Sequence, residues 1–171
     1  GKSTFFNSLG ATVGDYAGSI AVKLLTTDKN NQGASLATLR GKRLVITGEL
    51  EEHQRLSVAM LKQLASTDRL VIEEKYRQPE TVTPSHSLVL FTNHLPRVGS
   101  VDNGTWRRLT VVPFNATIPP SESVANYGDV LAKEAGPAIL AWAIQGAVNF
   151  ARNGYKLDIP EAVEEITDAY R

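Results

Sequence analysis

Two short apolar runs, each closed by polar residues, constrain the fold of this chain more than any other feature of its sequence. Residues 43–47 (Arg-Leu-Val-Ile-Thr) follow Gly41, and residues 87–92 (Ser-Leu-Val-Leu-Phe-Thr) end at Asn93. Apolar runs without alternation are typical of strands that are buried on both faces, as in parallel sheets. A third strand is expected over residues 109–114. Because helical patterns lie between and after these runs, the sequence predicts an α/β fold with a parallel sheet core and a helical C-terminal part.

A helix and a hairpin are expected between the first two runs. Apolar residues four apart, at Leu56, Met60 and Leu64, predict a helix over residues 54–66. The next apolar stretch predicts a strand over residues 68–75, which pairs with a strand over residues 80–83.

The pattern becomes helical from residue 127 onward. Pro137 suits a first helical turn, and Asn153 with Gly154 suits the end of that helix. Pro160 opens a last helix. One apolar stripe of the first of these helices comprises Ile139, Trp142, Ala143, Ala147 and Phe150.

Composition excludes several classes of protein. The 171 residues are 42% hydrophobic and 21% charged, which suits one globular domain, and 18 basic residues balance 18 acidic ones. Any contact with nucleic acid must therefore be a local patch. The absence of cysteine excludes disulfides, a thiolate zinc site and a cysteine nucleophile. We find neither a membrane-spanning run nor a signal peptide, so we expect a cytoplasmic protein without membrane contact.

The first four residues, Gly1-Lys2-Ser3-Thr4, match the second half of the phosphate-binding motif G-x-x-x-x-G-K-[ST]. In that motif backbone N–H groups cradle phosphates, the Lys reaches the β- and γ-phosphates and the hydroxyl binds Mg²⁺. Residues 5–10 are expected to form the short helix that follows such a loop. We interpret the preceding strand and the first half of the loop as missing from this chain.

Acids follow the first apolar run, at Glu49, Glu51 and Glu52. Carboxylates at the carboxyl end of a parallel strand lie where α/β sheets bind ligands, and nucleotide hydrolysis needs acids near Mg²⁺ and near water. The alternative is a helix start, where acidic residues are favoured.

Asn93 closes the second run, and its amide could contact a γ-phosphate and hold the attacking water. The alternative is a simple turn residue. His53, His86 and His94 are read as structural or surface residues.

Two basic groups remain. Arg107 and Arg108 follow Trp106, and such a pair suits charge stabilisation of a transferring phosphoryl group from a neighbouring subunit, or else a surface ion pair.

The other basic group comprises Lys62, Lys75, Tyr76 and Arg77. It could bind single strands by stacking and phosphate contacts, or be a solvated hairpin face.

Taken in order, these blocks resemble the superfamily 3 helicases, in the phage and plasmid primase-helicase branch related to the poxvirus primase-helicase. The matching stretches are residues 1–5, 41–45 with Glu49 and Glu52, 61–62 with 67–68, 90–96, 102 with 106–108, 113–114, 139–142, Gly146 and Pro160.

The resemblance implies a P-loop NTPase with an AAA+-like ATPase core, here residues 1–120, and a helical part of the same domain, residues 121–171. It also implies ATP-dependent DNA helicase activity in phage, prophage or plasmid replication, with a single strand in the pore of a homo-hexameric ring and a possible primase domain in the parent chain.

The resemblance also assigns roles to single residues. Gly1, Lys2, Ser3 and Thr4 bind ATP, and Ser3 with Glu49 binds Mg²⁺. Glu51 or Glu52 activates water, Asn93 is the sensor residue and Arg108 is the arginine finger. The basic hairpin residues and Lys62 touch DNA.

Two departures from the family pattern keep other readings open. Leu50 stands where many P-loop motors have a second acid, and Ser66 and Thr67 replace a Gly-Gly pair before Asp68. An ATPase-inactive module for DNA binding or oligomerisation remains an alternative. A P-loop kinase or GTPase switch is a weaker third one.

Overall fold

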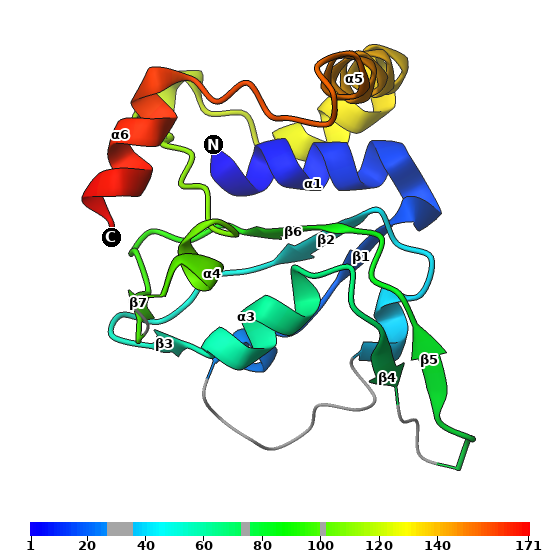
Figure 1. Cartoon of the computed structure of the whole chain (residues 1–171). Coiled ribbons are helices and arrows are strands. Elements are labelled where there is room, and N and C mark those ends of the chain that lie inside the picture. The colour runs from blue at the N-terminus through cyan, green and yellow to red at the C-terminus, as the bar shows by residue number, and fades with distance from the viewer. Residues whose placement is uncertain (27–35, 73–75, 100–101) are drawn as a thin grey trace. The chain divides into compact units, whose positions relative to one another are not determined.

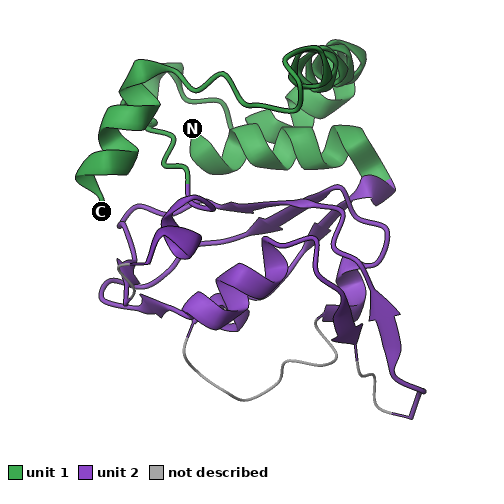
Figure 2. Cartoon of the chain, in the orientation of Figure 1, with its two compact units in different colours: residues 1–14, 110–171 green, residues 15–109 purple. Residues whose placement is uncertain are grey.

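The computed structural model describes residues 1–26, 36–72, 76–99 and 102–171 (Figure 1). They form two compact units, which Figure 2 distinguishes by colour. Unit 1 comprises residues 1–14 and 110–171, and unit 2 comprises residues 15–109.

Unit 2 is built on a three-stranded parallel sheet in the order β1-β2-β6. The strands are β1 (Ala17–Ser19), β2 (Leu44–Thr47) and β6 (Ser87–Leu90). Both strands predicted at β2 and β6 are therefore confirmed, and they are direct parallel neighbours. The central strand β2 buries Val45 and Thr47 almost completely. The sequence analysis did not predict β1, a strand of three small residues.

Helix α3 (Val58–Leu64) confirms the predicted helix but is shorter. It starts after Ser57, whose hydroxyl accepts a hydrogen bond from the Met60 N–H at 3.3 Å and so caps the helix. The residues before it form β3 (Arg55–Leu56) instead, which pairs in parallel with β7 (Arg97–Val98). In Figure 1, α3 lies beneath the three strands of the main sheet.

The predicted hairpin is confirmed as the antiparallel pair β4 (Leu70–Ile72) and β5 (Glu80–Val82). Leu70 and Ile72 are buried, and the side chain between them faces solvent, as a half-buried strand requires. Arg40 forms an ion pair with Glu80 beside the hairpin.

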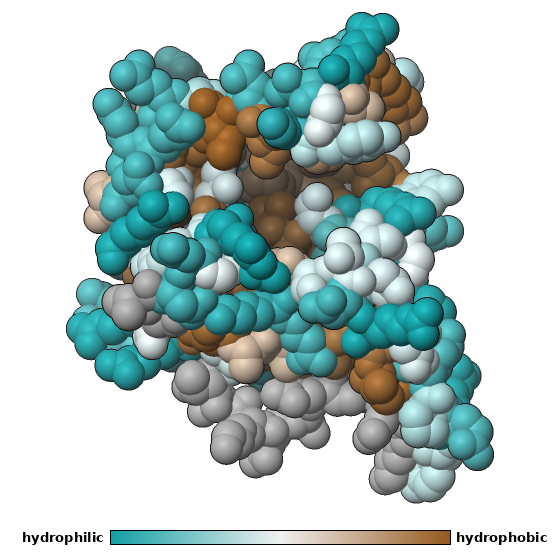
Figure 3. All heavy atoms as spheres, in the orientation of Figure 1, coloured by the Kyte–Doolittle hydropathy of each residue, from teal (hydrophilic) through white to brown (hydrophobic). Residues whose placement is uncertain are grey.

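The apolar core lies in unit 2. Its buried members come from the sheet, α3, the hairpin, the short 3₁₀ helices η2 (Val22–Leu25) and η3 (Ala37–Leu39), strand β3 and residues that flank these elements. They are Ile20, Leu24, Leu25, Leu36, Leu39, Val45, Leu50, Leu56, Met60, Leu64, Leu70 and Ile72. On the face drawn in Figure 3, the surface of this unit is mostly hydrophilic, which agrees with an apolar interior.

Unit 1 is helical, with α1 (Lys2–Val13), α5 (Tyr127–Arg152) and α6 (Glu161–Ala169). Helices α1 and α5 approach closely where α5 begins, since a Cβ on Gly128 would lie 3.3 Å from the Thr4 carbonyl oxygen. The Phe5 ring packs edge-on against the ring of Trp142, with centroids 5.9 Å apart.

Helix α1 does not end at Gly10, as the sequence predicted. It continues to Val13 and ends at Gly14, whose φ of 58° suits glycine and whose N–H donates to the Gly10 carbonyl. Other short helices among the described residues are η1 (Gly14–Tyr16), α4 (Asn103–Trp106) and η4 (Pro120–Glu122).

The strand predicted over residues 109–114 is wrong. The Val111 N–H donates to the Thr167 hydroxyl of α6 at 3.0 Å, and Pro113 has no N–H to give to a sheet. An apolar run cut by proline thus has no strand assignment here, and its Val111 N–H pairs with a helix side chain instead.

The predicted position of Pro137 is also wrong, because α5 begins ten residues earlier and the proline lies inside it. The predicted end is confirmed, since Asn153 follows the last helical residue and Gly154 has a φ of 67°. The predicted apolar stripe is only partly covered, because Trp142 is 61% exposed whereas Ile139 is partly buried. No helix in the described part of the chain has the length and apolar character to span a membrane.

The partly buried His86 predicts a pH-dependent stability. Burial lowers the pKa of His86 below its usual 6.5, against a smaller opposite effect of the Leu64 backbone. As the pH falls, the unfolded chain therefore binds this proton at a higher pH than the folded chain does. The contribution of neutral His86 to the free energy of unfolding is complete above pH 6.5 and decreases as the pH falls from there through the lowered pKa of the folded state. We expect urea unfolding to show lower stability at acid pH than at neutral pH, and His86→Gln to lose part of that difference. An identical difference in the variant would contradict this assignment.

Candidate functional site

The carboxyl ends of β2 and β6 bring an acid and an amide together. Thr47 and Leu90, the last residues of the two strands, are register partners, so both strands end at the same level. Glu49 follows β2 and Asn93 follows β6, and the Asn93 Nδ2 donates to the Glu49 Oε1 at 3.2 Å. Both residues are exposed. Two residues that the sequence analysis selected separately therefore form one hydrogen-bonded pair, the Glu49–Asn93 pair.

The pair offers the chemistry of a carboxylate held in place at the end of a parallel sheet. Such a carboxylate can accept a proton from water or act as one ligand of a divalent cation. Within the described residues, no group of three or more His, Asp or Glu side chains could hold a metal ion by itself. Mg²⁺ is commonly bound by one or two carboxylates together with substrate phosphates, so Glu49 suits the role of a carboxylate ligand.

Leu50 explains why no second acid directly follows Glu49. Its side chain is only 4% exposed and belongs to the apolar core, where a carboxylate would lose its hydration. The next acids are exposed, and the Glu52 Oε1 lies 3.9 Å from the His53 Nε2. The Glu51 backbone N–H donates to the Gln54 Oε1 at 3.1 Å. Within the described part of the chain, only Glu49 of the three predicted acids is hydrogen-bonded to Asn93.

Lys62 lies on α3 and is paired with Asp102, at 2.9 Å between its Nζ and the Asp102 Oδ1. Asp102 also caps α4, because its Oδ1 accepts the Thr105 N–H at 3.0 Å and its Oδ2 accepts the Thr105 hydroxyl at 3.0 Å. This ion pair thus connects α3 to the residue that caps α4.

The two adjacent arginines differ in their surroundings. The partly buried Arg108 donates from Nη1 to the Gly104 carbonyl at 2.5 Å and from Nε to the Ala65 carbonyl at 3.3 Å. It thereby joins the end of α3 to α4. Arg107 is exposed, and no hydrogen bond or ion pair of its guanidinium occurs among the described residues.

The residues of the phosphate-binding motif lie in unit 1. Gly1 precedes α1, and Lys2, Ser3 and Thr4 form its first turn, where the Gly1 carbonyl accepts the Phe5 N–H at 3.0 Å. A Lys and a hydroxyl residue in the first helical turn are what the motif requires. Each unit thus carries some of the predicted site residues.

The predicted basic patch of the hairpin is described only in part. Lys75 lies outside the described residues. Tyr76 is 92% exposed with a φ of 69°, and Arg77 is exposed beside it. Lys62, the fourth member of the predicted patch, pairs with Asp102 as described above.

The sequence analysis passed over Arg55 and Arg97, which are direct neighbours in the β3–β7 pair. Neither arginine belongs to a motif. Only the strand pairing shows that they lie together, and no feature of the sequence alone would have joined them.

Fold and site together define a mixed α/β protein with a small parallel sheet and an acid–amide pair at the ends of adjacent strands. The chain belongs to the family described as "Family of unknown function (DUF5906)", whose model matches residues 1–108.

Curated relatives connect the chain to viral proteins named as helicases. A "putative helicase" of Acanthamoeba polyphaga mimivirus is 30% identical over 117 residues, which cover 67% of this chain and 12% of that protein. A "putative helicase" of Invertebrate iridescent virus 6 is 28% identical over 116 residues, which cover 61% of this chain and 12% of that protein. The chain thus spans about an eighth of the length of these relatives, and its sequence is similar to a part of proteins named as helicases.

The capping role of Asp102 leads to a stability prediction. Asp102→Ala removes both the cap of α4 and the pairing with Lys62, and we expect a loss of about 1 kcal/mol in the free energy of unfolding. Asp102→Asn keeps a capping oxygen, so we expect it to cost less. Urea unfolding of both variants and of the parent protein measures this. Equal losses in the two variants would show that the charge pair, rather than the cap, stabilises α4.

Proposed function

We propose that this chain is the nucleotide-hydrolysing part of an ATP-dependent nucleic-acid helicase of the superfamily 3 type. The observation that carries the proposal is the Glu49–Asn93 pair, with 3.2 Å between the Asn93 Nδ2 and the Glu49 Oε1. It lies at the carboxyl ends of neighbouring parallel strands, where α/β sheets bind ligands. Viral relatives named as helicases support the choice of activity.

In this proposal the chain positions groups rather than forming a covalent intermediate. Phosphoryl transfer depends mostly on alignment and on charge stabilisation. Asn93 orients the Glu49 carboxylate and senses the terminal phosphate, and Glu49 is the acid on the Mg²⁺ side of the site. Glu51 or Glu52 would activate the attacking water. Both of these are exposed and therefore accessible to water.

The roles of Gly1, Lys2, Ser3 and Thr4 rest on the motif. We assign their backbone and the Lys2 ammonium to the ATP phosphates, and the Ser3 hydroxyl to Mg²⁺ together with Glu49. The cation supplies positive charge that offsets the charge developing on the phosphate oxygens.

We further propose a homo-hexameric ring that takes single-stranded DNA into its pore, in phage, prophage or plasmid replication, with a primase domain elsewhere in the parent chain. Lys62, Lys75, Tyr76 and Arg77 would contact that strand. The resemblance supports these assignments, and the high exposure of the Tyr76 ring suits base stacking.

The second candidate is a DNA-binding or oligomerisation module without ATPase activity. It is favoured by the burial of Leu50, which leaves no second acid beside Glu49. Nucleic-acid binding and assembly that survive Lys2→Ala, in a protein that hydrolyses no ATP, would support it.

The central test removes the two members of the pair separately. Asn93→Ala and Glu49→Gln should each lower DNA-stimulated ATP hydrolysis by about 10²-fold or more, because each disturbs the alignment of the reacting groups. Glu134→Gln, which removes one exposed carboxylate of α5, is the matched control and should leave hydrolysis unchanged. Circular dichroism of all three variants checks the fold. Full turnover in Asn93→Ala would overturn the proposed function.

Substitutions of Arg107 and Arg108 should have different effects when variant and parent subunits are mixed. The resemblance implies that Arg108 is the arginine finger. Because Arg108 donates to two backbone carbonyls of its own unit, we instead assign it a positioning role and propose the exposed Arg107 as the trans-acting residue. Arg107→Ala subunits mixed with parent subunits should lower hydrolysis more steeply than their fraction, at unchanged thermal stability. Arg108→Ala should lower the melting temperature. A loss strictly proportional to the Arg107→Ala fraction would mean active sites that are not shared between subunits.

A further inference from the structure

Arg55 and Arg97 form a pair of like charges on one strand face. They are register partners in the parallel strands β3 and β7, and Leu56 and Val98 are the next pair of partners along these strands. Leu56 is buried, whereas both arginines are exposed, so the two guanidinium groups share the outer face. Neighbouring strands lie about 4.8 Å apart, which brings the two side chains out next to each other.

This arrangement has no internal compensation in the described part of the chain. No hydrogen bond or ion pair of either guanidinium is found there. The Glu52 carboxylate, three residues before Arg55 in the sequence, lies 3.9 Å from the His53 Nε2. Like charges directly opposite each other destabilise a strand pair. An external anion would relieve that repulsion, and the planar guanidinium matches phosphate oxygens well.

We propose that the Arg55–Arg97 pair binds the phosphodiester backbone of a nucleic-acid strand. Both arginines stand on an open, exposed face, which suits a polymer that continues past them. The pair lies on the two connections that carry the acid–amide pair. Arg97 follows Asn93 by four residues, so their Cα atoms are at most about 14 Å apart. The inference rests on the proposed function for the kind of polymer, and it adds a contact surface separate from the hairpin.

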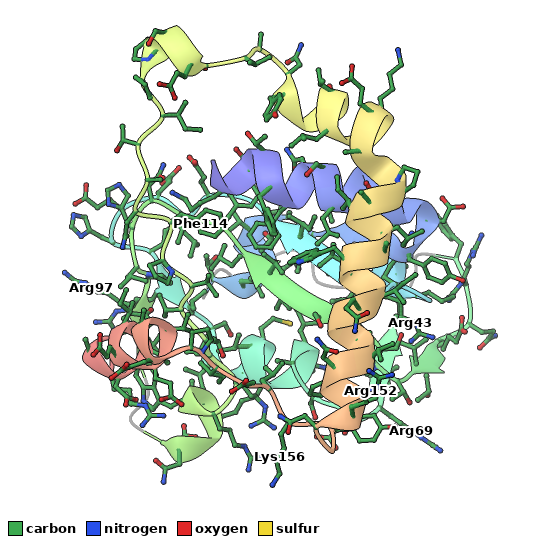
Figure 4. All side chains as sticks on the ribbon, turned by 90° about the horizontal axis from the view of Figure 1, so that it is seen from above. Arg43, Arg69, Arg97, Phe114, Arg152 and Lys156 are labelled. Atoms are coloured by element: carbon green, nitrogen blue, oxygen red, sulfur yellow. The ribbon has the colours of Figure 1, made fainter. Side chains whose placement is uncertain are left out.

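The test measures binding of a fluorescein-labelled oligo(dT) strand by fluorescence anisotropy over a range of salt concentrations. Arg55→Gln combined with Arg97→Gln should weaken binding about tenfold at low salt. The slope of log affinity against log salt should become shallower by about 1.4, because each lost phosphate contact removes about 0.7. The matched control is Arg69→Gln, an exposed arginine of the same unit that lies well apart from Arg97 in Figure 4 and should leave the affinity nearly unchanged.

Three outcomes would overturn the inference: an unchanged affinity in the double variant, an equal loss in Arg69→Gln, or a loss confined to a fluorescent ATP analogue, which would assign the pair to nucleotide phosphates. Urea unfolding should show the double variant to be at least as stable as the parent protein, because the repulsion is gone. ATP hydrolysis without oligonucleotide reports on the proposed function separately. If the protein hydrolyses no ATP but the double variant shows the expected loss of binding, the proposed ATPase function is contradicted and the nucleic-acid contact at Arg55 and Arg97 is supported.

Discussion

The parallel pairing of β2 with β6 is the constraint on which the described site depends. Parallel neighbours that end in register deliver the residues after them to one edge of the sheet, and here those residues are Glu49 and Asn93. The segments that follow the two strands also pair with each other a few residues later, as β3 and β7. A slip of one residue would turn Val45 out of the core and separate the acid from the amide.

Polar contacts around α4 help to hold the segment that carries Arg107 and Arg108 in a defined place. The Asp102 carboxylate accepts the Thr105 N–H at the start of a four-residue helix and also forms an ion pair with Lys62. Arg108 donates to the carbonyls of Ala65 and Gly104, one from each of two helical segments. These polar contacts add to the burial of Thr105 and Trp106, whereas Arg107 is exposed.

Much of unit 2 could be predicted from sequence because its signals are local. Apolar runs closed by polar residues predicted β2 and β6, and a short apolar stretch around Leu70 predicted the hairpin. The misses have a common physical origin. The run at residues 109–114 has strand-like composition, but its Val111 N–H finds Thr167, a partner 56 residues away. The pairing of Arg55 with Arg97 is equally non-local. Pro137 lies inside the long helix α5 rather than in its first turn, where proline is usually found.

The order of synthesis gives the sheet a particular folding problem. Glu49 and Asn93 are separated by 44 residues, and β2 has no β6 to pair with until the intervening helix and hairpin have been made. Long-range parallel pairing is slow, because the chain loses loop entropy before the contacts form. Helix α3 and the β4–β5 hairpin use only nearby residues and can form earlier. A ribosome-bound chain would thus expose the unpaired edge of β2 until β6 has been synthesised. During this period we expect chaperones to bind the chain most strongly.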